Sequence, residues 1–119
     1  MNTEKIVETV VKAADDKKAL DIVVLDMKEV SGVSDAFIIM EAMNNRQISA
    51  IADNIIEKAK EAGLSVHHVE GDAASGWILI DLLDVVVNVF SHDERYFYNL
   101  EKLWSDAPMI DVSHLTEVE

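Results

Sequence analysis

The 119-residue sequence contains no cysteine and only one proline. Without cysteine the chain can form neither a disulfide nor a thiolate metal site, which fits a reducing compartment. Half of the residues are hydrophobic, so the composition is not that of a disordered or low-complexity chain. The apolar runs are far shorter than the roughly 18 residues of a membrane span, and no signal segment opens the chain. These absences predict a cytoplasmic, single-domain protein that buries its own core.

Positive charge is also scarce. Ten Lys and Arg against 23 Asp and Glu give a net charge of −13. The basic residues are scattered and form no patch of the kind that a nucleic-acid backbone requires, so we expect no direct nucleic-acid binding. An acidic surface suits a basic protein partner, because charge speeds encounter and excludes wrong partners. The alternative is that the charge only keeps the protein soluble.

Apolar residues recur at intervals of three and four in three segments, which predicts three amphipathic helices. The first follows Asn2 or Thr3, either of which can cap it. The second follows Asn44 or Asn45 and ends before Gly63, which occupies the position of a C′ glycine.

The third predicted helix begins with a capping box formed by Ser91 and Glu94, and it ends before Pro108. A single apolar stripe on this helix contains Phe97, Leu100, Leu103 and Trp104. Residues 108–119 are expected to form a loose acidic tail after a domain of residues 1–107.

Runs of β-branched and apolar residues predict five strands, at residues 21–27, 35–41, 64–70, 77–80 and 85–90. The second helix joins the second and third strands by a crossover of the length that parallel pairing needs. The last two strands form an antiparallel hairpin. The predicted fold is therefore α/β, a single domain with a mixed sheet of about five strands and three main helices.

The hairpin is the most informative stretch of the chain. The simplest pairing places Leu82 and Leu83 at its tip, although leucine suits a primed turn poorly. With a period of two, one face is an aliphatic core face: Ile78, Ile80, Val85, Val87 and Val89. The other face mixes large apolar groups with polar ones: Trp77, Leu79, Asp81, Asp84, Val86, Asn88 and Phe90. This mixture suits contact with another protein, and the alternative is that a helix or loop of the same chain covers it.

The residue types that usually form catalytic or metal sites are not arranged for either role in this sequence. No Asp-x-Asp pair occurs, and Asp81 and Asp84 are expected to be solvated turn residues. His67 and His68 point to opposite faces of a strand and cannot hold one ion together. The loop at residues 71–76 lacks the lysine and the following helix of a phosphate-binding loop. We therefore predict no catalytic residue, metal or cofactor.

The aromatic residues gather in the C-terminal half of the chain. A base-stacking platform would need basic neighbours, and only Arg95 and Lys102 are near. Tyr and Trp are typical interface anchors, so Trp77 and Tyr98 are expected to contact a partner, whereas Phe97 is assigned to the core.

Several segments together resemble the ribosomal silencing factor family, also called Iojap. They are residues 34–39, 45–47, 51–52, 76–81, 84–87, 89–90, 94–101 and 103–107, with the sequences SDAFII, NRQ, IA, GWILID, DVVV, VF, ERYFYNLE and LWSDA. The order and spacing of these segments cover nearly the whole chain up to Ala107. The sequence departs from the family pattern at Leu82 and Leu83, at Asn88 where the family has histidine, and at Ala36 where it has an aromatic residue.

The resemblance implies a fold related to the nucleotidyltransferases but without their catalytic motif. It also implies binding to the large ribosomal subunit through the fourteenth large-subunit protein, which blocks joining of the small subunit and lowers translation under nutrient limitation. The contact residues expected from it are Trp77, Leu79, Asp81, Asp84, Val86, Asn88 and Tyr98, with Met40 and Arg95 as further candidates. Two alternatives stay open: a nucleotidyltransferase-like enzyme with an unrecognised site, and a homodimer formed through the same face.

Overall fold

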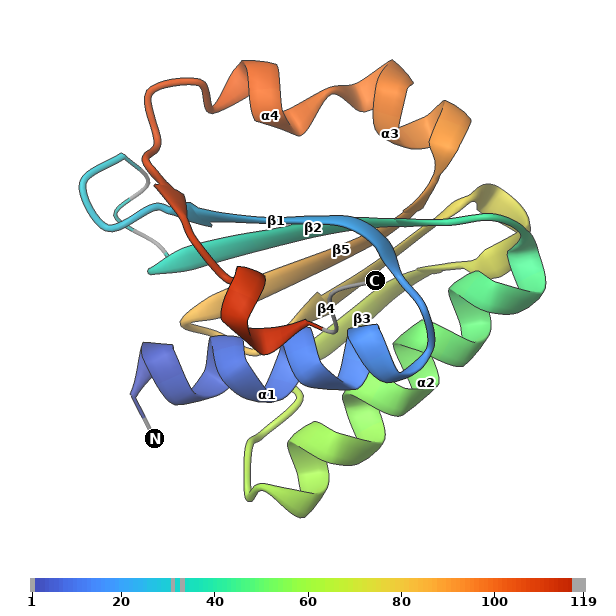
Figure 1. Cartoon of the computed structure of the whole chain (residues 1–119), viewed down its shortest axis with the longest axis horizontal. Helices are drawn as coiled ribbons and strands as arrows, with labels where there is room; N and C mark the ends of the chain where they lie inside the picture. Colours follow the sequence, from blue (N-terminus) through green and yellow to red (C-terminus); the bar gives the residue numbers. More distant parts are fainter. Residues whose placement is uncertain (1, 31, 33, 117–119) are drawn as a thin grey trace.

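The computed structural model describes residues 2–30, 32 and 34–116. A mixed sheet lies between two helical layers (Figure 1). Helices α1 (Thr3–Asp16) and α2 (Asn45–Glu61) cover one face of the sheet, and the shorter α3 (His92–Tyr98) and α4 (Leu100–Leu103) lie over the other. The predicted α/β fold class is confirmed.

The sheet has six strands in the order β3-β4-β5-β2-β1-β6. Their bounds are β1 Leu20–Asp26, β2 Ala36–Ala42, β3 His68–Asp72, β4 Trp77–Asp81, β5 Val85–Ser91 and β6 Met109–Ile110. Strands β2 and β5 pair in parallel, and the other neighbours pair antiparallel, so the predicted mixed sheet is confirmed. The predicted crossover is wrong in one respect, because α2 carries the chain past β5 and β4 to the far edge of the sheet, and β5 takes the place beside β2.

The main core lies between the sheet and the helices α1 and α2. It contains the predicted aliphatic face of the hairpin, and Ile80, Val87 and Val89 have no exposed surface. The amphipathic helices contribute further fully buried side chains: Val10, Val11, Ile48, Ile51 and Ile55. Each such side chain stabilises the fold by roughly 1.5–3 kcal/mol relative to exposure, so this layer fixes the position of β4 and β5.

The helix ends are capped as the sequence predicts. Asn2 accepts a hydrogen bond from the backbone N–H of Lys5, and Asn44 accepts one from that of Gln47 at 2.8 Å. The Gln47 side-chain amide also donates to two carbonyl oxygens just after α1, at Lys17 and Lys18. The start of α2 is therefore joined to the end of α1.

The predicted hairpin tip is wrong by one position. Leu82 donates its backbone N–H to the carbonyl of Val85 at 2.9 Å, so the two tip residues are Leu83 and Asp84, and Leu83 has φ +73°. Leu82 is buried and belongs to the core. The shift moves the pairing by two residues, so that Asp81 lies opposite Val86. Because a shift of two preserves the alternation, the predicted assignment of residues to the two faces is unaffected.

The predicted third helix is broken. Asn99 adopts a left-handed conformation with φ +47°, ends α3 and caps α4. The single apolar stripe is therefore wrong: Phe97 and Leu103 are 76% and 67% exposed. Leu100 and Trp104 pack on the sheet, where Trp104 meets Phe37 edge-on at 6.0 Å between ring centroids.

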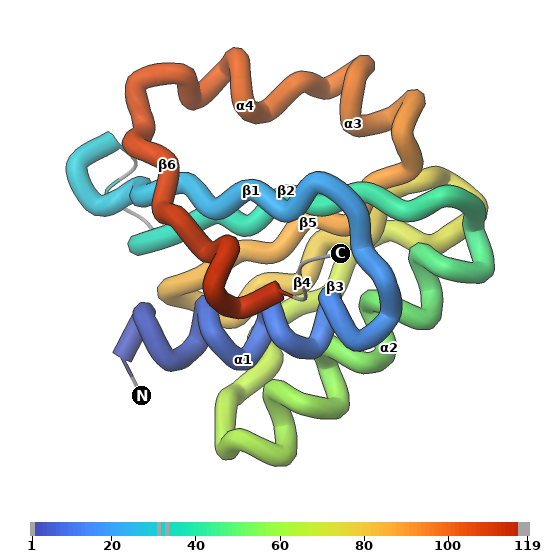
Figure 2. Tube along the Cα trace, viewed as in Figure 1, coloured from blue at the N-terminus to red at the C-terminus, as the bar shows by residue number. Residues whose placement is uncertain are grey.

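The expectation of a loose tail is wrong for residues 109–116. Met109 and Ile110 pair with Leu25 and Val24 of β1, and Val112 is buried. Figure 2 shows that β6 lies at β1 and that the chain then turns toward α1. Residues 117–119 lie outside the described residues.

We expect Asn44→Ala to lower the free energy of unfolding by about 1 kcal/mol, because the start of α2 loses the acceptor for an orphan N–H. Asn45→Ala is the matched control, since the side chain of Asn45 is exposed and is not the cap. Urea denaturation of both variants measures the difference. Equal unfolding midpoints would show that Asn44 does not contribute through its cap.

Candidate protein-interaction site

The candidate site lies on the face of the sheet opposite α1 and α2. Four half-buried side chains, which we call the hairpin face, project there from β4 and β5: Trp77, Leu79, Asp81 and Val86. Helix α3 packs over β5 and β2, whereas the whole of β3 is exposed. A helix of the same chain therefore covers this face over β5 and β2, as the alternative interpretation expected. The half of the face toward the β3 edge stays open.

Trp77 forms the boundary between the covered and the open half. Its ring stacks on Phe90 at 5.1 Å and contacts Tyr98 of α3 at 4.5 Å between centroids. Its indole Nε1 donates to Oδ1 of Asn88 at 3.1 Å. Asn88 is 1% exposed, and its Nδ2 has no hydrogen-bond acceptor among the described residues. Trp77 is thus both a surface residue and a part of the fold.

An ion-pair cluster holds α3 in place over the sheet. The Arg95 guanidinium donates to Glu101 at 3.0 Å and to Glu41 of β2 at 3.5 Å, and His92 meets the same Glu41 carboxylate at 2.9 Å. The side chains of Arg95 and Glu41 are only 10% and 13% exposed. A buried charge is tolerated only when it is paired, so this cluster fixes α3 and with it Tyr98.

The predicted contact residues divide into two groups. Trp77, Leu79, Asp81, Asp84, Val86 and Tyr98 all have solvent-accessible surface on the hairpin or on α3. Met40 is fully buried on the opposite side of β2, so the prediction that it contacts a partner is wrong. Asn88 is also buried, and it acts by positioning Trp77. The guanidinium of Arg95 is held by two carboxylates of its own chain.

Two acidic residues near the hairpin face were not identified as site residues from the sequence. Glu70 lies beside Leu79 in the sheet and pairs with His68 at 2.8 Å, and Glu94 belongs to the first turn of α3. The spacing of two between His68 and Glu70 on one strand was an available signal. Nothing local marked Glu94, whose position depends on the packing of α3. Both acids line a cavity of about 270 Å³ beside Trp77.

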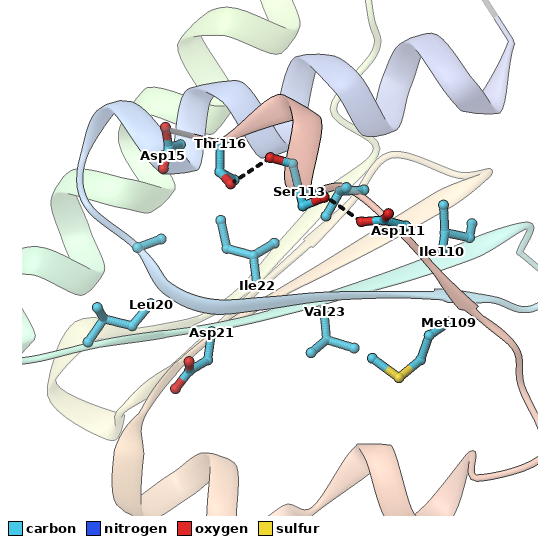
Figure 3. Close-up of a pocket in the computed structure, with 12 residues that line it drawn as sticks. Asp15, Leu20, Asp21, Ile22, Val23, Met109, Ile110, Asp111, Ser113 and Thr116 are labelled. Atoms are coloured by element: carbon cyan, nitrogen blue, oxygen red, sulfur yellow. Dashed lines mark hydrogen bonds between the residues drawn. The ribbon is translucent and has the colours of Figure 1, made fainter. Parts of the chain in front are cut away.

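A second cavity, of about 580 Å³, lies between the first half of β1 and the C-terminal segment (Figure 3). Asp15, Asp21 and Asp111 stand around it. Hydrogen bonds from Ser113, its backbone N–H first, hold the pKa of the Asp111 carboxyl below the ordinary value. Asp21 has φ +48° in the irregular stretch of β1 between Leu20 and Val23, before the two residues of β1 that pair with β6. We place the candidate site at the hairpin face.

Over residues 2–30, 32 and 34–116, no three His, Asp or Glu side chains lie close enough together to hold a metal ion. The interpretation that the sequence has no paired acids is wrong for one Glu-x-Asp spacing, Glu70 and Asp72, but Asp72 accepts the backbone N–H of Ser75 and Glu70 pairs with His68. Within the same ranges no helix is long and apolar enough to cross a membrane. Fold and site together define a small α/β protein whose distinctive surface is an open, acidic and apolar hairpin.

Comparison with known proteins identifies the family. A family model described as "Ribosomal silencing factor during starvation" matches residues 1–119, and the chain belongs to this family. It is 47% identical over 112 residues to the ribosomal silencing factor RsfS of Bacillus subtilis, an alignment that covers 94% of this chain and 95% of that protein. It is 36% identical to the chloroplastic protein Iojap of Zea mays over 89% of this chain and 46% of that protein. A solved structure from Bacillus halodurans, 42% identical, superposes with a TM-score of 0.82 over 92% of this chain and all of that one. The resemblance inferred from the sequence is confirmed.

We expect Trp77→Ala to lower the free energy of unfolding by about 2–4 kcal/mol, because two ring contacts are lost and Asn88 loses its donor. Trp77→Phe retains a ring against Phe90 and Tyr98 and should cost about 1–2 kcal/mol. Chemical denaturation of the three proteins tests this order. If Trp77→Ala is as stable as the wild type, the aromatic stack does not support the fold.

Proposed function

We propose that this protein represses translation by binding the large ribosomal subunit through its fourteenth protein and blocking the small subunit from joining. Membership of the ribosomal silencing factor family supports the ribosome as the target. The observation that carries the proposal is the open hairpin face, in which Leu79 and Val86 lie among carboxylates. Such a surface is suited to a protein that carries basic side chains.

The two kinds of side chain on this surface have different roles in the proposed complex. The apolar groups of Trp77, Leu79 and Val86 supply the area that is removed from water and hence most of the affinity. Asp81 and Asp84 lie at the exposed end of the hairpin, where they raise the association rate and make it salt-dependent. The net charge of −13 strengthens the attraction toward a basic surface.

Repression by this route needs no catalytic step. The folded chain measures 34 × 32 × 32 Å, so a copy bound on the joining face of a subunit holds the second subunit away by its volume alone. We therefore propose a non-enzymatic factor that acts in the cytoplasm, where subunits join. A second copy of the chain is the competing occupant of the hairpin face, and repulsion between two chains of charge −13 opposes it.

Co-sedimentation with isolated large ribosomal subunits tests the proposal. We expect the wild type to bind more weakly as salt rises, and Leu79→Arg to bind at least about tenfold more weakly, because it replaces an apolar contact with a repelling charge. Leu79 is preferable to Trp77 as the variant because it has no comparable role in the fold. A light-scattering assay should show that the wild type inhibits joining of small subunits and that Leu79→Arg does not.

Met109→Arg is the matched control, since Met109 is 70% exposed on β6 at the opposite edge of the sheet. It should bind subunits as the wild type does. Equal binding by Leu79→Arg and Met109→Arg would move the interface away from the hairpin face. Failure of the wild type to sediment with large subunits would overturn the proposed function.

A further inference from the structure

We infer that the cavity beside Trp77 is a binding pocket for a cationic side chain, arginine by preference, presented by the protein partner. The inference deepens the proposed function and rests on it for the identity of the partner as a ribosomal protein. Trp77, Leu79 and Tyr98 give the pocket apolar and aromatic walls, and Glu70 and Glu94 place two carboxylates at it. Its volume of about 270 Å³ is enough for one long side chain.

The Glu94 carboxylate is available because the capping box at the start of α3 is only half formed. Ser91 Oγ accepts the backbone N–H of Glu94 at 3.2 Å, as the motif predicts. The reciprocal bond would use the backbone N–H of Ser91, but this N–H donates at 2.8 Å to the carbonyl of Gly76. The half-buried Glu94 carboxylate consequently has no hydrogen bond or ion pair among the described residues.

Two glycines give the pocket its shape. Gly76 has φ +82°, and a Cβ there would lie 2.7 Å from Cγ of Glu94, so only glycine lets the Glu94 stem pack against the start of β4. A Cβ at Gly71, which also has positive φ, would collide with the backbone carbonyl of Trp77. Gly76 therefore lets the start of β4 approach α3 closely, and Gly71 lets β3 approach β4 closely. Glu70 and Glu94 line the same cavity.

The chemistry of the lining selects a cation. Aromatic faces attract a guanidinium or ammonium group, most strongly where water is partly excluded. Carboxylates form charge-assisted hydrogen bonds with the same groups, and the planar guanidinium can stack and donate at once. Among the described residues no Lys, Arg or His lines the pocket, and the side chain nearest to its carboxylates from outside is His68, which meets Glu70 at 2.8 Å. A neutral ligand could donate a hydrogen bond to Glu94 but would not compensate its charge, and an anionic ligand would be repelled by it.

The first test titrates the free protein with N-acetyl-arginine amide. NMR monitors the indole N–H resonance of Trp77, and the indole N–H resonance of Trp104 is the internal reference. We expect a saturable shift at Trp77 with a dissociation constant of roughly 1–50 mM. The neutral isostere N-acetyl-citrulline amide should produce none, and N-acetyl-lysine amide should bind more weakly than the arginine probe. Glu94→Gln should abolish the shift.

Asp93→Asn is the matched control, because Asp93 lies in the same helical turn, is exposed and does not line the pocket. It removes one negative charge and one favourable interaction with the dipole of α3, as Glu94→Gln does. It should preserve the shift of the Trp77 indole resonance. Equal responses to arginine and citrulline probes, or a shift that survives Glu94→Gln, would overturn the inference.

The second test repeats co-sedimentation with large ribosomal subunits at about 50 mM salt. Glu94→Gln should bind about five- to tenfold more weakly than Asp93→Asn, with a smaller dependence on salt. If the two variants bind equally while Leu79→Arg binds poorly, the proposed function stands and the pocket does not hold the partner's cation. If the wild type fails to bind subunits, the proposed function is wrong, and the titration with N-acetyl-arginine amide alone decides whether the pocket binds cations.

Discussion

The stacking of Trp77 between the sheet and α3 is the interaction on which the arrangement of the functional surface depends. Its ring lies against Phe90 of β5 and Tyr98 of α3, and its indole N–H is held by buried Asn88. On the far side of α3, the Arg95–Glu41 ion pair holds the same helix to β2. Helix α3 is thus held to the sheet at two points, by aromatic stacking and by charge. This double attachment gives a seven-residue helix, too short to be stable alone, a fixed position over the sheet.

The sequence predicted those parts of the structure that depend on local pattern. The caps at Asn2 and Asn44 and the assignment of hairpin residues to two faces follow from side-chain chemistry and from a period of two. The break at Asn99 was not predictable from the apolar spacing, because Phe97 before it and Leu100 after it continue the same pattern in the sequence. Burial of Met40 could not be distinguished from exposure either, since β2 is apolar on both faces.

The candidate site shows the same division between local and tertiary information. Leu79, Asp81 and Val86 were identified correctly as one surface because a strand fixes the direction of each side chain. Glu94 was interpreted only as a cap, since its free carboxylate depends on a hydrogen bond between Ser91 and Gly76 that lies outside the helix motif. The dual role of Trp77 was hidden for a similar reason. Sequence indicates that a large aromatic residue is present, and only tertiary structure shows how much of its surface the fold itself uses.

The parallel pairing of β2 with β5 has a consequence for how the protein is made. The central ladder joins residues 36–42 to residues 85–91, so more than a third of the chain lies between its two strands. Non-local pairing of this kind closes late, because a long loop must be ordered before any contact compensates for it. During synthesis β1 can pair with β2 and β3 with β4, but the two pairs are joined only when β5 has been made, and β6 then adds to β1 from the C-terminal end. A chain that ended before β5 would therefore lack the strand that joins β2 to β4, and the two parts of the sheet would have no ladder between them.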